Sequence, residues 1–276
     1  MSSFGSRLKL AIENYGHLCV GIDPSAEQLS SWNLPTSALG AERLAMEILD
    51  ACSGKVGIVK PQVSFFEQFG PAGFDALSQV LSKAREMGFL VIADAKRGDI
   101  GSTMNGYARA WLVSEAPFFC DALTLSPYLG PESLGETIEL AIENERGVFL
   151  LAATSNPESL SVQHAQSQGE SVASLVASYA ESLNKSFLGS IGLVIGASVD
   201  LATAGISEEL LVNTPVLVPG FGAQGTKLSS AGSILRSARS NMICSVSRSV
   251  AGTTKSGLHE RLELALRELS EGMASD

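Results

Sequence analysis

The sequence lacks the features that would place it in a membrane or outside the cell. It has no run of 18 apolar residues, so we expect no transmembrane helix. Its first sixteen residues form a short amphipathic pattern with charges inside it, and they lack the apolar stretch of a secretory signal peptide. The four cysteines lie far apart and form no CxxC pair. We therefore expect a cytoplasmic protein whose cysteines are core thiols.

Signals for metal ions and for charged macromolecular partners are also missing. The three histidines are scattered, without the spacing of metal ligands. The formal net charge of -10 gives a surface that repels nucleic acid and anionic membranes. No linker, low-complexity segment or break in composition divides the chain. The sequence thus predicts one domain over residues 1–276 that begins with a short N-terminal helix, with no metal ion and with no nucleic-acid or membrane partner.

The sequence does contain an alternation of two patterns. Eight short apolar runs, each ending in polar or turn residues, cover 18–23, 56–60, 89–94, 121–125, 148–153, 192–197, 215–220 and 242–247. Stretches with helical spacing accompany them at 41–52, 73–88, 133–145, 173–189 and 257–269. Runs that are apolar throughout indicate strands covered on both faces, and this alternation predicts an α/β fold, a (β/α)₈ TIM barrel. An open doubly wound sheet is the rival fold. The long polar stretch 154–170 is expected to be a loop over the active face.

Charged residues concentrate where the predicted strands end. The segment VIADAKRGDIGST runs from an apolar strand directly into Asp94, Lys96 and Asp99. Side chains at i and i+2 share a strand face, so Asp94 and Lys96 are expected to point into the same barrel mouth. Asp23 and Lys60 follow the first and second strands. Catalytic groups of a TIM barrel lie at such strand ends, and alternating charges keep one another ionised when buried. The alternative is an ordinary ion-pair network that only caps the barrel.

A positively charged region lies near the C-terminus. Residues 226–259 contain five lysines or arginines and no acidic residue. They cover the loops after the seventh and eighth predicted strands, where this type of barrel binds phosphate. The segment PGFGAQG allows backbone amides to approach an anion, but no acidic residue follows it at about 20 residues, as a dinucleotide site requires. Arg248, just past the eighth strand, is placed to reach a phosphate.

Taken together, these motifs resemble the orotidine 5′-phosphate decarboxylase family over the whole chain. DAKRGDIGST resembles that family's Asp-x-Lys-x-x-Asp motif with its following Thr, and GIDP, KPQVSFFE, TSNP, PGFGAQG and the SR pair at 247–248 follow the family's order. KPQ and GAQG are similar to its longer bacterial subgroup. The resemblance implies decarboxylation of orotidine 5′-monophosphate (OMP) to uridine 5′-monophosphate (UMP), the last step of de novo pyrimidine biosynthesis. It also implies a homodimer with shared active sites that needs no cofactor.

The resemblance implies a role for each matching residue. The charged catalytic tetrad consists of Lys60, Asp94, Lys96 and Asp99. The substrate contacts come from Asp23, Thr103, Ser155, Gln224 and Arg248. Among these, Asp23 and Lys60 bind the ribose hydroxyls, and Gln224 and Arg248 hold the 5′-phosphate. Thr103 and Asp99 reach into the partner subunit's site. Ser155 contacts the pyrimidine, or Thr154 does so if the motif is shifted by one residue.

The chemistry expected of this family fits these residues. When CO₂ leaves C6 of the pyrimidine, Lys96 stabilises the charge left on C6 and supplies a proton, with its ammonium held by Asp94 and Asp99. A related magnesium-dependent keto-sugar-phosphate decarboxylase or aldolase is the main alternative. It needs a carboxylate ligand at the end of the second strand, where this chain has Lys60. A non-catalytic phosphate-binding barrel is a third possibility, and the fully occupied tetrad argues against it.

Overall fold

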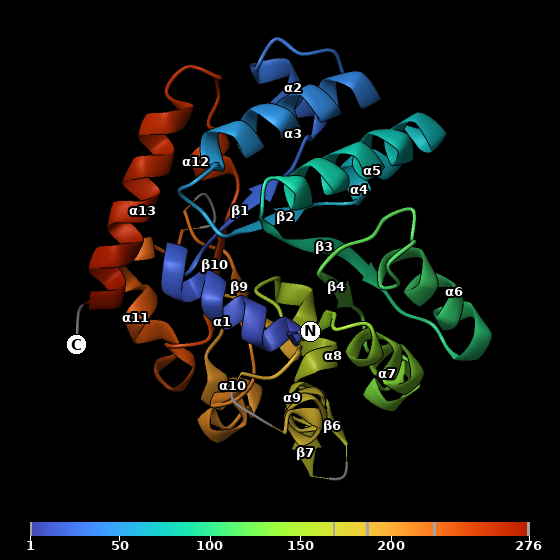
Figure 1. Cartoon of the computed structure of the whole chain (residues 1–276). Helices are drawn as coiled ribbons and strands as arrows, with labels where there is room; N and C mark the ends of the chain where they lie inside the picture. Colours follow the sequence, from blue (N-terminus) through green and yellow to red (C-terminus); the bar gives the residue numbers. More distant parts are fainter. Residues whose placement is uncertain (1, 168, 186–187, 223–224, 275–276) are drawn as a thin grey trace.

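Eight parallel strands close into a barrel in the computed structural model, which describes residues 2–167, 169–185, 188–222 and 225–274. The strands are β1 (Leu18–Ile22), β2 (Ile58–Pro61), β3 (Leu90–Arg97), β4 (Ala122–Leu125), β5 (Gly147–Ala153), β8 (Ile191–Ile195), β9 (Val216–Pro219) and β10 (Met242–Val246). They follow the order β1-β10-β9-β8-β5-β4-β3-β2 around the barrel. The predicted TIM barrel is therefore confirmed, and the closure excludes an open doubly wound sheet (Figure 1).

Helices surround this barrel on its outer face (Figure 1). The longer ones are α1 (Phe4–Tyr15), α3 (Ala38–Cys52), α5 (Gly70–Glu86), α6 (Gly101–Trp111), α7 (Gly135–Glu143), α9 (Val172–Leu183) and α13 (Leu258–Ala274). The short ones are α2 (Ala26–Ser31), α4 (Ser64–Glu67), α10 (Leu201–Ala204), α11 (Ala231–Ile234) and α12 (Arg248–Ala251). Short 3₁₀ segments are η1 (Pro131–Leu134), η3 (Glu208–Leu211), η4 (Leu228–Ser230) and η5 (Arg236–Ala238). All five predicted helical stretches overlap a helix, but α6 was not among them, because its glycines weaken the helical pattern.

The N-terminal helix α1 closes one end of the barrel. Phe4 and Leu8 are fully buried among the side chains inside the barrel. A Cβ atom on Gly147, the first residue of β5, would overlap the Phe4 ring, so the glycine permits this close approach. Arg7 of the same helix pairs with Asp121, next to the start of β4. Because α1 covers the amino ends of the strands, only their carboxyl ends remain open for a site.

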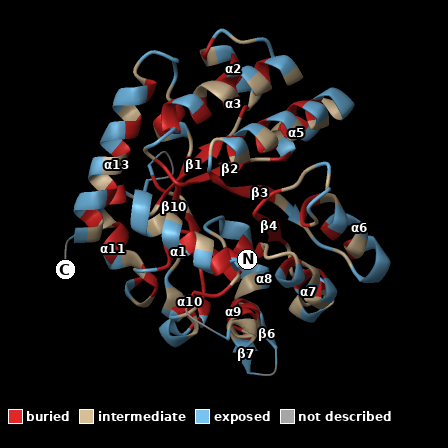
Figure 2. Ribbon diagram, in the orientation of Figure 1, coloured by how far each residue is buried: buried red, intermediate tan, exposed pale blue. Residues whose placement is uncertain are grey.

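Burial follows the two layers of the fold (Figure 2). The strands are buried along almost their whole length, whereas the outer faces of the helices are exposed. The larger apolar cluster lies between the strands and the helices, and a smaller cluster fills the inside of the barrel. No helix in the described part of the chain is both long and apolar enough to cross a membrane.

The stretch 154–170 is more ordered than the sequence indicated. It was expected to be a loop, but it contains the 3₁₀ segment η2 (Pro157–Ser159), the helix α8 (Leu160–Gln163) and the strand β6 (Gln166–Ser167). β6 pairs in antiparallel fashion with β7 (Glu170–Ser171). Pro157 occupies the first position of η2, where its fixed φ and missing N–H are tolerated. The segment is the expected connection after β5, but it contains short ordered elements that the sequence did not predict.

Candidate active site

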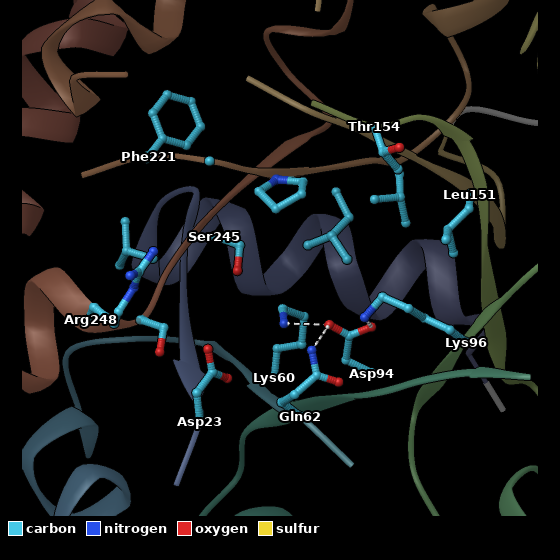
Figure 3. Close-up of a pocket in the computed structure, with 16 residues that line it drawn as sticks. Asp23, Lys60, Gln62, Asp94, Lys96, Leu151, Thr154, Phe221, Ser245 and Arg248 are labelled. Atoms are coloured by element: carbon cyan, nitrogen blue, oxygen red, sulfur yellow. Dashed lines mark hydrogen bonds and ion pairs between the residues drawn. The ribbon is translucent and has the colours of Figure 1, made fainter. Parts of the chain in front are cut away.

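A pocket of about 260 Å³ opens at the carboxyl ends of the barrel strands (Figure 3). Its charged lining residues come from four strand ends, and they are Asp23, Lys60, Asp94, Lys96 and Arg248. Three cations face two carboxylates, so the pocket carries one net positive charge when all five groups are ionised. In a chain of net charge -10, such a pocket favours a small anionic ligand.

Asp94 is the centre of the charged array. It is 7% exposed, and its two carboxylate oxygens accept hydrogen bonds from two different lysines. Lys60 Nζ lies 2.8 Å from Oδ2, and Lys96 Nζ lies 2.6 Å from Oδ1. Lys60 is as buried as Asp94, at 6% exposed, whereas the Lys96 side chain is 45% exposed. One carboxylate thus holds a buried cation on one side and a cation that faces the pocket on the other.

Two uncharged side chains complete the surroundings of Asp94. Gln62, which follows β2, donates through Nε2 to Oδ2 at 3.1 Å. Thr124 of β4 donates through its hydroxyl to Oδ1 at 3.0 Å. Sequence analysis assigned no role to either residue. Gln62 is two residues beyond Lys60, the spacing that places side chains on one strand face, and this unused signal could have found it. Threonine is common in strands, so Thr124 gave no such signal.

The charges of the array stabilise one another. Burial by itself lowers the pKa of Lys60, but the carboxylates of Asp94 and Asp23 outweigh it and hold that pKa above its ordinary value. Burial also favours the neutral form of Asp94, but Lys60 and Lys96 outweigh it and hold the pKa of Asp94 well below its usual range. Lys60 and Asp94 are therefore both ionised at neutral pH despite their burial.

Lys96 reaches the pocket through an irregular strand end. Ala93 pairs with Leu123 and Arg97 pairs with Leu125, so β3 has extra residues over this stretch compared with β4. Lys96 lies in this bulge with a φ of 50°, in the left-handed region. Such a conformation costs about 1–3 kcal/mol and persists only where the surroundings enforce it. The simple alternation of strand faces predicted that Asp94 and Lys96 share the pocket, but it did not predict the bulge that brings Lys96 there.

Asp23 and Arg248 lie on the opposite side of the pocket from Lys96 (Figure 3). The Oδ1 atom of Asp23 is shielded from solvent and has no hydrogen-bond partner among the described residues. Asp23 itself lines the pocket, so its carboxylate is an acceptor at the edge of the cavity. Arg248 is exposed and begins the short helix α12 directly after β10. Of the five cations predicted to form the C-terminal positive region, Arg248 alone appears among the described residues that line the pocket.

The glycine-rich segment after β9 contributes backbone to the same side. Gly220 and Phe221 line the pocket, and Gly220 and Gly222 have φ values of 111° and 72°. Only glycine adopts a φ near 111° without strain, so the sequence PGFG allows this turn. Gln224, which the sequence assigned to the phosphate, lies outside the described residues.

The end of β5 presents Thr154 to the pocket rather than its neighbour. Thr154 is among the lining residues and is half-buried, whereas Ser155 is exposed and is not among them. Gln163 of α8 holds Thr154 with two hydrogen bonds, accepting from its backbone N–H at 2.8 Å and donating to its hydroxyl at 2.9 Å. The Thr154 hydroxyl also donates to Asn156 Oδ1 at 2.7 Å. Of the two residues considered from the sequence, the geometry thus places Thr154 at the pocket.

Asp99 and Thr103 lie apart from this pocket within their own chain. Thr103 is exposed and Asp99 is half-buried, and neither is among the pocket-lining residues. Asp99 follows β3, and its Oδ1 accepts a hydrogen bond from the backbone N–H of Ile100 at 2.8 Å. Thr103 lies in the first turn of α6. The structure therefore brings together three members of the predicted tetrad, Lys60, Asp94 and Lys96, and leaves Asp99 on the outer surface.

Part of the pocket wall is apolar. It includes Leu151 of β5, Val194 of β8 and Leu217 of β9, together with Phe221. An apolar wall opposite a few charged groups suits a flat ring that carries polar substituents. Within the described ranges, no group of three or more His, Cys, Asp or Glu residues is arranged to hold a metal ion.

Comparison with known proteins gives a consistent set of relatives. The model of the "Orotidine 5'-phosphate decarboxylase / HUMPS family" matches residues 16–255. The chain is 44% identical over 254 residues to orotidine 5′-phosphate decarboxylase of Streptomyces coelicolor, covering 91% of this chain and 90% of that protein. A solved structure of a Streptomyces avermitilis protein has a TM-score of 0.93 at 40% identity and covers 100% of this chain and 97% of that one. OMP decarboxylase of Leishmania donovani has a TM-score of 0.79 at 29% identity, covering 99% and 100% of the two chains.

Proposed function

This chain belongs to the orotidine 5′-phosphate decarboxylase family and converts OMP to UMP in pyrimidine biosynthesis, and on this premise we propose how its pocket performs the reaction. Residues 1–276 form one catalytic domain, and its reacting groups are Lys60, Asp94, Lys96 and Asp99. The observation that carries this proposal is the Lys60–Asp94–Lys96 array at the strand ends, with both Asp94 oxygens bonded to lysine.

The reaction needs a cation at the carbon that loses CO₂. When the bond between C6 and the carboxylate breaks, its electron pair remains on C6 in an orbital outside the ring's π system. Lys96 stabilises this charge and transfers an Nζ proton to C6, which forms UMP. Its bond to Asp94 fixes the ammonium before the reaction, so little reorganisation is needed as the charge develops. Because the Lys96 side chain is 45% exposed, it can regain a proton from solvent after product release.

The remaining pocket residues hold the nucleotide. The carboxylate of Asp23, together with Lys60, binds the ribose hydroxyls, and both residues line the pocket. Arg248 and Gln224 bind the 5′-phosphate, and the guanidinium of Arg248 offers two parallel N–H donors to it. Ser155 contacts the pyrimidine in the sequence-based assignment, and the placement of Thr154 in the pocket favours the Thr154 hydroxyl for this contact. Binding energy from the phosphate, far from C6, contributes to the rate.

We infer that Asp99 and Thr103 act in the site of a partner subunit. Thr103 is exposed, Asp99 is half-buried, and both lie outside their own pocket. The surface around them carries large apolar side chains, with Ile100 59% exposed and Tyr107 of α6 36% exposed. Tyr128, which follows β4, is 78% exposed. Exposed apolar side chains of this size are typical of a protein interface. A symmetric homodimer would exchange Asp99 and Thr103 reciprocally and would contain two composite sites.

Mixing two inactive variants tests the composite site. Lys96→Ala and Asp99→Asn are each expected to be nearly inactive, and they are co-refolded in equal amounts. Random pairing makes about half of the dimers mixed. In each mixed dimer one site contains both substitutions, and the other site has Lys96 and Asp99 intact. Activity should therefore return to about a quarter of wild type.

The control pair is Lys96→Ala with Asp94→Asn. Both residues line the pocket of their own chain, so mixing these variants should restore no activity. If the first mixture also restores nothing although mixed dimers form, Asp99 acts within its own chain and the shared-site proposal fails. If the control mixture recovers activity, the assignment of Asp94 and Lys96 to one pocket fails.

We propose a cytoplasmic location and no requirement for a metal ion, another cofactor, nucleic acid or a membrane. All four cysteines are free and buried, which suits a reducing compartment. Burial raises the pKa of the Cys19 thiol to about 12, so this thiol stays protonated. The net charge of -10 opposes binding to nucleic acid or anionic membranes. Both oxygens of Asp94 accept bonds from lysine cations, and these cations would oppose a second cation at this carboxylate.

A further inference from the structure

We propose that Thr124 of β4 is a positioning residue that holds Asp94 and Lys96 in their reactive arrangement, an inference that rests on the roles proposed for those two residues. Its hydroxyl makes two hydrogen bonds at once. It donates to Asp94 Oδ1 at 3.0 Å, and it accepts from the backbone N–H of Lys96 at 2.9 Å. The first bond fixes a carboxylate oxygen, and the second fixes the backbone that carries the amine.

The carboxylate oxygen concerned is the one that binds Lys96. Asp94 Oδ1 receives the Thr124 hydroxyl and the Lys96 ammonium, whereas Oδ2 receives Lys60 and Gln62. A hydroxyl has one proton to donate, and here it goes to a charged acceptor, which makes the bond stronger than one between neutral groups. Thr124 therefore helps to set the direction of the Oδ1 lone pairs that face the Lys96 amine.

The second bond acts at the strained point of the site. Lys96 has a φ of 50°, and the regular pairing of β3 with β4 shifts between Ala93 and Arg97. Within this bulge the Lys96 N–H finds its partner in a side chain of the neighbouring strand, at Thr124. A left-handed lysine needs surrounding contacts that enforce it. Thr124 supplies one such contact and so determines where the Lys96 side chain leaves the backbone.

The Thr124 hydroxyl is buried, so it cannot contact substrate and can act only through Asp94 and Lys96. Thr124 is 1% exposed and is absent from the residues that line the pocket. Loss of the hydroxyl should therefore alter the chemical step and leave substrate binding nearly unchanged. A second threonine of equal burial, Thr137 of α7, provides the matched comparison. It is also 1% exposed, but its hydroxyl has no hydrogen-bond partner among the described residues.

Two pairs of variants isolate the hydroxyl. Thr124→Val keeps the shape of the side chain and removes the hydroxyl, and Thr124→Ser keeps the hydroxyl and removes the methyl group. Thr124→Val should lower kcat for OMP by roughly tenfold to a hundredfold, the effect of losing hydrogen bonds to a charged group and to a reactive residue's backbone. KM should change by less than about threefold, since the proposed ribose and phosphate contacts remain. Thr124→Ser should restore kcat to within about threefold of wild type.

The same substitution at Thr137 controls for a general loss of buried structure. Thr137→Val should keep wild-type kcat and KM. If Thr124→Val does not fold, Thr124→Ser and Thr124→Ala form the second pair, since they differ by the hydroxyl alone, and Ser should exceed Ala in kcat by at least about tenfold. Folding is followed by circular dichroism and thermal melting.

The outcomes separate this inference from the proposed function. If Thr124→Val keeps wild-type kcat, or if the kcat of Thr124→Ser is as low as that of Thr124→Val, the hydroxyl does not position the site and the inference is overturned. An increase in KM with unchanged kcat also overturns it. The proposed function is tested separately by Lys96→Ala measured in parallel. If that variant is as active as wild type, the role of Lys96 fails, whatever Thr124→Val shows.

Discussion

Removal of the charge at Asp94 should leave both lysines of the Lys60–Asp94–Lys96 array without the carboxylate that pairs with them. Asp94→Asn preserves the size of the side chain and leaves Lys60 as a buried cation without its closest carboxylate. In the native chain the two groups are 2.8 Å apart, and both side chains are more than 90% buried. Because the charge of Lys60 is then uncompensated at this contact, the variant should be less stable and nearly inactive.

The structure sets the magnitude of the loss. Breaking a buried ion pair by removing one partner costs about 3–5 kcal/mol. The second pair, between Asp94 and Lys96, adds less than about 1 kcal/mol, because the Lys96 side chain is 45% exposed and solvent screens it. We therefore expect a loss of about 3–5 kcal/mol in the free energy of unfolding at pH 7, or a fall in Tm of roughly 6–15 °C.

The pH dependence has a definite sign. In the native chain, Asp94 titrates below its ordinary pKa of 3.8 and Lys60 above its ordinary 10.5, so their mutual stabilisation is present between those values. It is lost as pH falls through the pKa of Asp94 or rises through that of Lys60. In Asp94→Asn, burial acts on Lys60 with only Asp23 opposing it nearby, so we expect the pKa of Lys60 to fall below its ordinary value of 10.5. The unfolded chain then binds more protons, and the variant gains stability as pH rises.

Urea unfolding at pH 7 and at pH 9.5 measures this effect. The difference in the free energy of unfolding between wild type and Asp94→Asn should be smaller at pH 9.5 than at pH 7. Asp50→Asn, at an exposed aspartate of α3, is the control and should match wild type at both pH values. The reasoning is refuted if Asp94→Asn is as stable as wild type at pH 7. It is also refuted if the loss of stability relative to wild type is the same or larger at pH 9.5.

Two further predictions concern the phosphate and the metal. Arg248→Ala should raise KM for OMP and leave decarboxylation of the bare nucleoside nearly unchanged, because the nucleoside has no phosphate for Arg248 to bind. Steady-state kinetics with both substrates measure this. An equal loss of kcat/KM for the two substrates would show that Arg248 has another role. Exhaustive treatment with EDTA should leave the turnover of OMP unchanged, because lysines bind both oxygens of the central carboxylate; loss of activity that magnesium restores would contradict the proposal.

The barrel could be predicted from the sequence because its strands have a strong and simple pattern. Each of the eight apolar runs overlaps a strand, and Asp23, Lys60 and Asp94 lie at or near the carboxyl ends of strands, as barrel geometry requires. The pocket therefore followed from strand boundaries alone. α6 was not predicted, since its stability comes from packing of Met104, Ala108 and Trp111 rather than from helix propensity.

The fine geometry of the site could not be predicted, because it depends on contacts between distant segments. The bulge that carries Lys96 exists through pairing with β4, and the hydrogen bonds of Thr124 depend on that register. The choice between Thr154 and Ser155 follows from Gln163, which a short helix in a supposed loop brings into contact with Thr154. The position of Asp99 outside its own pocket agrees with the proposal that Asp99 acts in the site of a second subunit.

The central claim is that Lys96, held by Asp94, supplies the proton in OMP decarboxylation, and the direct test is the rate of UMP formation by Lys96→Ala. Lys55→Ala is the matched control, because Lys55 also pairs with a carboxylate, that of Glu263, but on the surface. The account predicts that Lys96→Ala remains folded and that its rate of UMP formation falls by at least the ~10²–10⁴-fold typical of a removed general acid. Lys55→Ala should keep full activity. Activity of Lys96→Ala within about tenfold of wild type would contradict the claim.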